Sequence, residues 1–320
     1  MKQKTHLYAP ILAGVILTLI AVSSLAVPFA KGLTGELFLV ETILRLLVFL
    51  LPLAFYCRVR SVNPVSSLQL RSFSLKKLPF LAVLCAILFV GILLLRYAGL
   101  FLFEENAFLN TPSAMSFFSD GSASLLSVLS GAVLPAVLEE LLFRGILLEE
   151  YRPYGPLQAV VMTSLLYALI HLSFANFVYY LFVGAVLGVI CISAGSVIPG
   201  LVIHVLINLS GLYVSPSVIE YLRQAGKSML LPYLLVALFL FLFVLLFARL
   251  ENIYRDRAYD EMLQSRKELL REELERAREL DGEKEKSKKI SFLETVKEMY
   301  LSPTFLLTCA LFVALTLGLF

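Results

Sequence analysis

The chain has 320 residues, of which 59% are apolar and only 16% are charged, and its formal net charge is +3. A soluble domain carries about 25% charged residues, so the composition excludes an ordinary soluble protein and favours one that resides in lipid. The small net charge gives no sign of nucleic-acid binding. The four cysteines form no CxxC pair and have no metal-ligand spacing, which is typical of small buried apolar residues.

Long apolar segments follow one another along the chain. A helix that crosses a bilayer needs about 20 apolar residues, and about nine segments approach this length. The predicted spans are 9–30, 36–57, 78–103, 124–148, 157–173, 177–194, 198–214, 229–248 and 303–320. We therefore predict an all-α fold, a polytopic bundle of about eight to nine transmembrane helices.

Charged residues in the connections predict the orientation of the chain. Lys2 and Lys4 precede the first span, and the connection at 58–77 contains basic residues without an acidic one. The connection at 104–123 contains acidic residues without a basic one. Because basic connections remain in the cytoplasm, we expect a multi-pass protein, most simply of the cell membrane, with a cytoplasmic N-terminus.

A charged segment at 249–302 separates the last two predicted spans. More than half of the Asp, Glu, Lys and Arg residues of the chain lie between Arg249 and Glu298, with both signs interleaved. Such interleaving is typical of a solvated helical arm, here on the cytoplasmic side. The alternative is a docking platform for a protein partner.

Charged residues inside predicted spans are functional candidates, because lipid makes them costly unless they are paired or hydrated. The span at 124–148 contains Glu139, Glu140 and Arg144. Glu140 and Arg144 are four residues apart, so they share a helix face and can form an ion pair. Glu139 points about 100° away and is free to face another group.

Histidines are rare in this chain, and two of its three lie in apolar spans. Tyr167 precedes His171 by four residues, and Asn208 follows His204 by four. Each pair therefore lies on one face of its predicted helix. One histidine in a span is typical of a packing residue, whereas two histidines, a free glutamate and an asparagine favour a site.

Two chemistries suit this set of residues. A carboxylate beside a neutral imidazole can take a proton from water, and a second imidazole and an amide can stabilise an oxyanion. Alternatively, Glu139, His171 and His204 could bind Zn²⁺ with one position open. We favour the metal-free scheme, because the chain has no HExxH motif. Every Asp lies outside the predicted spans and no GxSG motif occurs, which excludes an aspartyl dyad and disfavours a rhomboid-type serine protease.

Three motifs in succession, EExxxR, aromatic-xxx-His and HxxxN, resemble the CPBP family over about residues 120–215. This family comprises CAAX-processing and bacteriocin-processing intramembrane proteases, including the type II CAAX prenyl endopeptidases. The motifs run from Glu139 to Arg144, from Tyr167 to His171 and from His204 to Asn208. Tyr167 stands where the family more often has Phe, which keeps the aromatic ring and adds a hydroxyl.

The resemblance implies a role for each motif residue. Glu139 and His171 would activate the attacking water, while His204 and Asn208 would form the oxyanion site. The ion pair of the first motif and the tyrosine of the second would support these residues. Because many members of the family are described as metalloproteases, zinc stays open as a cofactor beside no cofactor at all.

We therefore predict an intramembrane endopeptidase that hydrolyses a peptide or protein substrate, of CAAX type or another, within the lipid bilayer. The predicted organisation is a membrane domain at 1–248 with its catalytic core at about 120–215, the charged cytoplasmic segment at 249–302, and a last transmembrane helix at 303–320. The alternative is a non-catalytic immunity or scaffold protein that retains the fold and acts through the charged arm, which would bind a protein partner.

Overall fold

The computed structural model describes residues 5–34, 37–62, 77–102, 128–213, 221, 224, 233–242, 244–245 and 292–318. All regular structure in these residues is helical, as predicted. The main helices are α1 (Thr5–Thr34), α2 (Leu37–Arg60), α4 (Leu78–Leu102), α7 (Leu134–Glu140), α8 (Leu148–Tyr151), α9 (Pro156–Ile170), α10 (Phe177–Ala194), α11 (Ile198–Tyr213), α15 (Phe292–Tyr300) and α16 (Pro303–Thr316).

Four of the described helices are long and apolar enough to cross a membrane. Their apolar stretches are Leu7–Leu25, Thr42–Arg60, Leu78–Leu95 and Phe177–Ala194. Shorter apolar helices occupy Pro156–Ile170, Ile198–Ser210, Tyr233–Leu242 and Pro303–Thr316. The chain is thus a multi-pass membrane protein, and a number of spans beyond these four stays a prediction.

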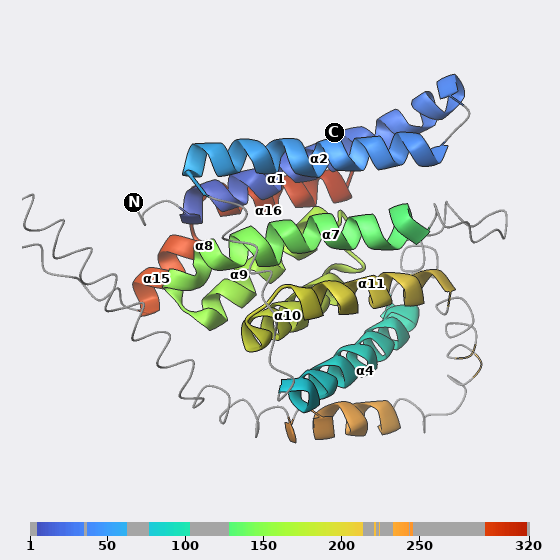
Figure 1. Ribbon diagram of the computed structural model, residues 1–320, viewed down its shortest axis with the longest axis vertical. Coiled ribbons are helices and arrows are strands. Elements are labelled where there is room, and N and C mark those ends of the chain that lie inside the picture. Colours follow the sequence, from blue (N-terminus) through green and yellow to red (C-terminus); the bar gives the residue numbers. More distant parts are fainter. Residues whose placement is uncertain are drawn as a thin grey trace, which may run out of the picture.

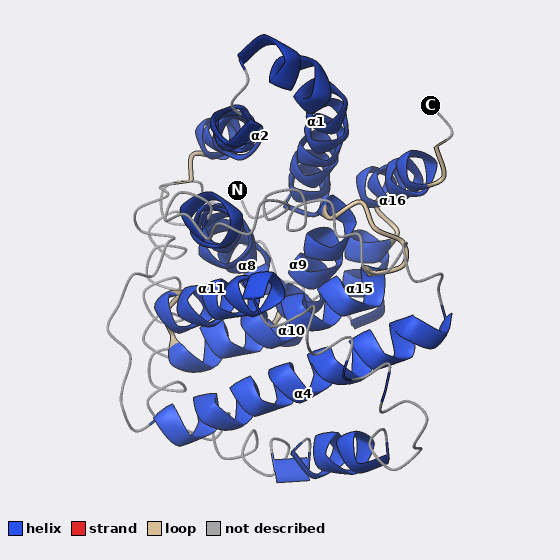
Figure 2. Ribbon diagram, turned by 90° about the vertical axis from the view of Figure 1, so that its right-hand side faces the viewer, coloured by secondary structure: helices blue, strands red, loops and turns tan. Residues whose placement is uncertain are grey.

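The helices form successive layers. α1 packs between α2 and α16, and it also contacts α9, which lies against α10 (Figure 1). α10 in turn contacts α11 and α4, so α9 and α10 form the centre of the bundle (Figure 2). Gly184 of α10 permits the close approach of α9, because a Cβ there would lie 3.1 Å from Cα of Ser164. Small residues at such crossings let helix backbones pack closely in a membrane.

The outer helices expose large apolar side chains that water would not favour. Leu25, Phe55 and Leu307 are 80%, 73% and 70% exposed. A surface of this kind is suited to lipid, whose chains are as apolar as the side chains themselves. The central helices instead bury their apolar residues, among them Leu166 and Leu187, each 0% exposed.

The C-terminal helix α16 joins the bundle beside α1. The Thr308 hydroxyl donates to the Pro10 carbonyl at 2.9 Å, and its Oγ1 lies 3.2 Å from where a Cβ on Gly14 would stand. Of the predicted charged arm, 249–291 lies outside the described residues and 292–300 is α15. The connections at 63–76 and 103–127 also lie outside them, so the orientation stays a prediction.

Candidate active site

The two adjacent glutamates, Glu139 and Glu140, are the last residues of α7, a short α-helix that lies between two π-helical segments. α7 is preceded by η2 (Leu129–Val133) and followed by η3 (Leu141–Leu147), both with the wider π winding. π-helical turns occur often at functional sites. Distant side chains bond two backbone carbonyls of η2: Arg45 of α2 donates to Ser130 O at 3.0 Å, and Asn208 of α11 donates to Ala132 O at 3.1 Å. These two hydrogen bonds hold η2, the segment that precedes the glutamates, to α2 and to α11.

The predicted ion pair between Glu140 and Arg144 is confirmed. Arg144 Nη1 lies 2.8 Å from Glu140 Oε1, and both side chains are 1% exposed. Nη2 of Arg144 donates to the Gly184 carbonyl at 3.1 Å. The guanidinium also lies 4.7 Å from the ring centroid of Tyr167. The pair therefore connects the glutamate helix to both central helices, α9 and α10.

His204 also contacts Glu140, a contact that helical spacing alone could not predict. Nδ1 of His204 lies 2.8 Å from Glu140 Oε1, the oxygen that also accepts from Arg144. A carboxylate held by a guanidinium accepts hydrogen bonds, so Nδ1 of His204 carries the hydrogen. In the neutral ring, Nε2 is therefore the acceptor, and it lies 3.6 Å from Glu139 Oε2.

His171 is fixed in the same tautomer by a different partner. Its Nδ1 donates to the backbone carbonyl of Tyr167 at 2.7 Å, because a carbonyl can only accept. Its ring stacks on Tyr180 with the centroids 3.7 Å apart and the planes 22° apart. Nε2 of His171 then lies 3.7 Å from Glu139 Oε2. The role of Tyr180 is not predictable from the sequence, since nothing distinguishes this residue there from the other aromatic residues of α10.

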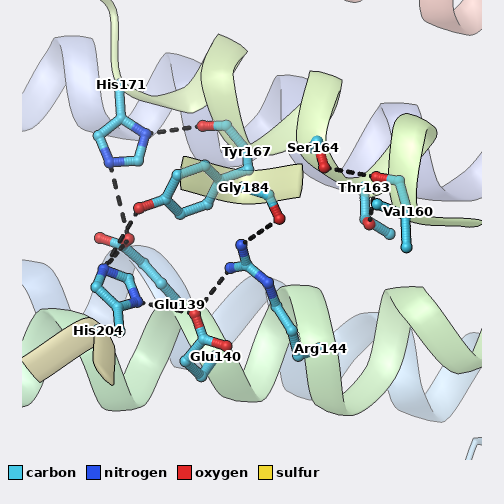
Figure 3. A network of polar contacts seen from close by, with 10 residues as sticks. All are labelled: Glu139, Glu140, Arg144, Val160, Thr163, Ser164, Tyr167, His171, Gly184 and His204. Atoms are coloured by element: carbon cyan, nitrogen blue, oxygen red, sulfur yellow. Dashed lines mark hydrogen bonds and ion pairs between the residues drawn. The ribbon is translucent and has the colours of Figure 1, made fainter. Parts of the chain in front are cut away.

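Glu139 is the point where these groups converge (Figure 3). Its side chain is 12% exposed, and Oε2 is buried without a hydrogen-bond partner among the described residues. Distances of 3.6 and 3.7 Å to the two Nε2 atoms are too long for direct hydrogen bonds. The structure thus brings together three of the four predicted catalytic residues, Glu139, His171 and His204.

Residues 121–210 match the family described as Rce1-like, type II CAAX prenyl endopeptidase. This segment is a CPBP-family domain. No curated protein and no solved structure matches the chain. The CPBP domain contains all three motifs of the site, and membership of this family implies a protease that acts on a protein substrate. Arg45, which bonds η2 from outside, comes from α2 and not from the CPBP domain.

The residues predicted to bind zinc are Glu139, His171 and His204, and Oε2 of the glutamate lies 3.7 and 3.6 Å from the two Nε2 atoms. Among the described residues, no group of three or more His, Cys, Asp or Glu side chains is arranged to bind a metal ion. Zinc would need the lone pair of His204 Nε2, and the hydroxyl of Tyr167 lies 3.3 Å from that atom.

Proposed function

We propose that the protein is an intramembrane endopeptidase in which Glu139 and His171 activate water to hydrolyse a peptide bond. The observation that carries this proposal is the convergence of Glu139 Oε2 with Nε2 of His171 and of His204, at 3.7 and 3.6 Å. The position between Glu139 Oε2 and His171 Nε2 suits a water that donates its two hydrogens to these two atoms and turns a lone pair outward. Membership of the CPBP family supports the same chemistry.

The reaction follows from this placement. The water oxygen attacks the carbonyl carbon of the substrate while one water proton passes to Glu139, with His171 as the second acceptor that orients the water. The electron pair of the carbonyl moves to its oxygen, and the resulting charge needs hydrogen-bond donors. Asn208 keeps one amide hydrogen besides the one on Ala132 O, and His204 can donate from Nε2 when its ring is protonated.

The substrate class follows from the family and the surroundings of the site. We propose a peptide or protein that approaches within the bilayer, with a prenylated CAAX terminus as the first candidate, because this is the substrate that the family description names. A prenyl chain would hold such a substrate in lipid, beside the apolar helices that surround the CPBP domain.

The test uses the full chain in liposomes with two internally quenched peptides that end in a CAAX sequence, one farnesylated and one not. We expect cleavage by the wild type and a loss of at least about 100-fold in Glu139→Gln, because Gln cannot take the proton. Glu149→Gln changes a carboxylate of α8 that pairs with Arg152, and this variant should cleave like the wild type. A strong chelator should leave the rate unchanged.

Two outcomes would refute the proposal. One is cleavage that survives Glu139→Gln. The other has two parts. Neither peptide is cleaved, and wild-type membranes contain no new protein terminus that Glu139→Gln membranes lack. A cellular phenotype that depends on 249–302 and persists in Glu139→Gln and in His171→Ala would instead support the non-catalytic alternative.

A further inference from the structure

The side chain of Tyr167 is held in one place in the wall of the site. Tyr167 is 2% exposed, and its ring lies 5.3 Å from the ring of Phe143 and 4.5 Å from that of His171. The guanidinium of Arg144 lies over the ring at 4.7 Å. These contacts direct the hydroxyl towards Glu139 and His204, as Figure 3 shows, and Oη lies 3.3 Å from His204 Nε2.

The hydrogen atoms of the site can be assigned from these contacts. Both imidazoles carry a hydrogen on Nδ1, because their partners there are a backbone carbonyl and a carboxylate. In the neutral rings both Nε2 atoms accept, and the carboxylate of Glu139 accepts as well. The Tyr167 hydroxyl therefore donates to His204 Nε2, and it brings a hydrogen into a group of acceptors.

Peptide hydrolysis is favoured by such a donor, in addition to Asn208. Negative charge develops on the carbonyl oxygen as water adds, and a fixed donor in a dry site stabilises that charge more than the ground state. The cation above the Tyr167 ring is attracted to its face and holds the ring in this position. His204 Nε2 orients the hydroxyl hydrogen until a stronger acceptor arrives.

We propose that the hydroxyl of Tyr167 is a catalytic group that donates a hydrogen bond to the oxyanion of the peptide bond being cut; this rests on the proposed function. The water oxygen bonds to carbon, its proton passes to Glu139, and the carbonyl pair moves to the oxygen that Tyr167 faces. The C–N bond then breaks, its electron pair goes to nitrogen, and nitrogen takes the proton from Glu139. The products are a carboxylic acid and an amine, and Tyr167 keeps its proton throughout.

The test is Tyr167→Phe in the liposome assay with the quenched farnesylated peptide. This change removes one oxygen and keeps the ring contacts and the Asn208 donor, so kcat should fall by about 10-fold or more while KM stays within about threefold. A peptide phosphonate that mimics the tetrahedral intermediate should bind more weakly to the variant, whereas a reduced-amide peptide should bind equally to both proteins. A tyrosine that only supports packing would not separate these two inhibitors.

The matched control is Tyr151→Phe. Tyr151 is 0% exposed on α8, and its hydroxyl is buried without a hydrogen-bond partner among the described residues. This variant should keep the wild-type kcat. A second variant, with 4-aminophenylalanine in place of Tyr167, supplies an N–H donor and should recover part of the kcat that Tyr167→Phe loses.

The outcomes separate this inference from the proposed function. If Glu139→Gln still cleaves the peptide, the proposed function itself is wrong. If Glu139→Gln is inactive but Tyr167→Phe keeps the wild-type kcat, only the role of the hydroxyl is wrong. A fall in kcat that 4-aminophenylalanine does not relieve, with equal loss of affinity for both inhibitors, would also overturn it.

Discussion

Removal of the Glu140 carboxylate should destabilise the protein strongly. In Glu140→Ala, Arg144 keeps its charge at 2% exposure with the Gly184 carbonyl and the Tyr167 ring as its described partners, and His204 loses the acceptor of its Nδ1 hydrogen. Breaking a buried ion pair from one side costs about 3–5 kcal/mol. With the lost bond from His204, we expect unfolding to become easier by about 4–6 kcal/mol.

A double-mutant cycle separates the pair from its surroundings. Arg144→Met should cost about 3 kcal/mol, since it removes the cation but leaves Glu140 with His204. The double variant Glu140→Ala/Arg144→Met should be more stable than the sum of the two losses predicts, by about 1–3 kcal/mol, because no buried charge is left unpaired. Unfolding by SDS in mixed micelles can be followed by far-UV circular dichroism, since the chain has no Trp.

Glu149→Ala, on the nearby helix α8, is the control, because the pair of Glu149 with Arg152 is partly exposed, at 16% and 17%. It should cost about 1 kcal/mol or less. Two results would contradict the reasoning about the buried pair. One is a loss of less than about 1 kcal/mol in Glu140→Ala, and the other is strict additivity of the two single changes.

Three further changes test other contacts. Gly184→Ala would place a Cβ 3.1 Å from Cδ1 of Tyr167, and this variant should lose about 1–3 kcal/mol of stability in the same unfolding assay. Wild-type stability would show that α9 and α10 can move apart to accept the methyl group. Asn208→Ala removes the bond to η2 and one proposed oxyanion donor, so kcat should fall by at least about 10-fold, and an unchanged kcat would exclude both roles. Glu150→Gln weakens the two-point contact with Arg60, and a loss of about 1–3 kcal/mol is expected; no loss would show that this contact does not hold α2 to α8.

Much of the site is predictable because helical periodicity is local. The spacing of Glu140 and Arg144 predicts their ion pair, and it also predicts that Glu139 points elsewhere. Which groups Glu139 faces depends on how three helices pack. Local spacing therefore does not predict the contact between Glu140 and His204 or the stacking of Tyr180 on His171.

The spans are predictable to a lesser degree, because hydrophobicity does not separate a lipid-facing helix from a buried one. The segment predicted at 124–148 is not one regular helix, since π turns stand on both sides of α7. The segments predicted at 157–173 and 198–214 form the shorter helices α9 and α11, which pack against neighbouring helices. Such helices satisfy the apolar pattern without the length that a full crossing requires.

The two adjacent glutamates differ in their hydrogen-bond partners, and this difference assigns them different roles. Oε1 of Glu140 accepts from Arg144 and from His204, and this side chain is 1% exposed. Glu139 is 12% exposed and has the two Nε2 atoms within 3.7 Å, so its neighbours offer lone pairs instead of hydrogens. The carboxylate of Glu140 has hydrogen-bond donors and is held in place. The carboxylate of Glu139 lies beside acceptors, so a bound molecule must supply its hydrogen bond. Under the proposed function, that hydrogen comes from the water that hydrolysis consumes, and the bond to Glu140 holds His204 in the tautomer whose Nε2 faces the Tyr167 hydroxyl.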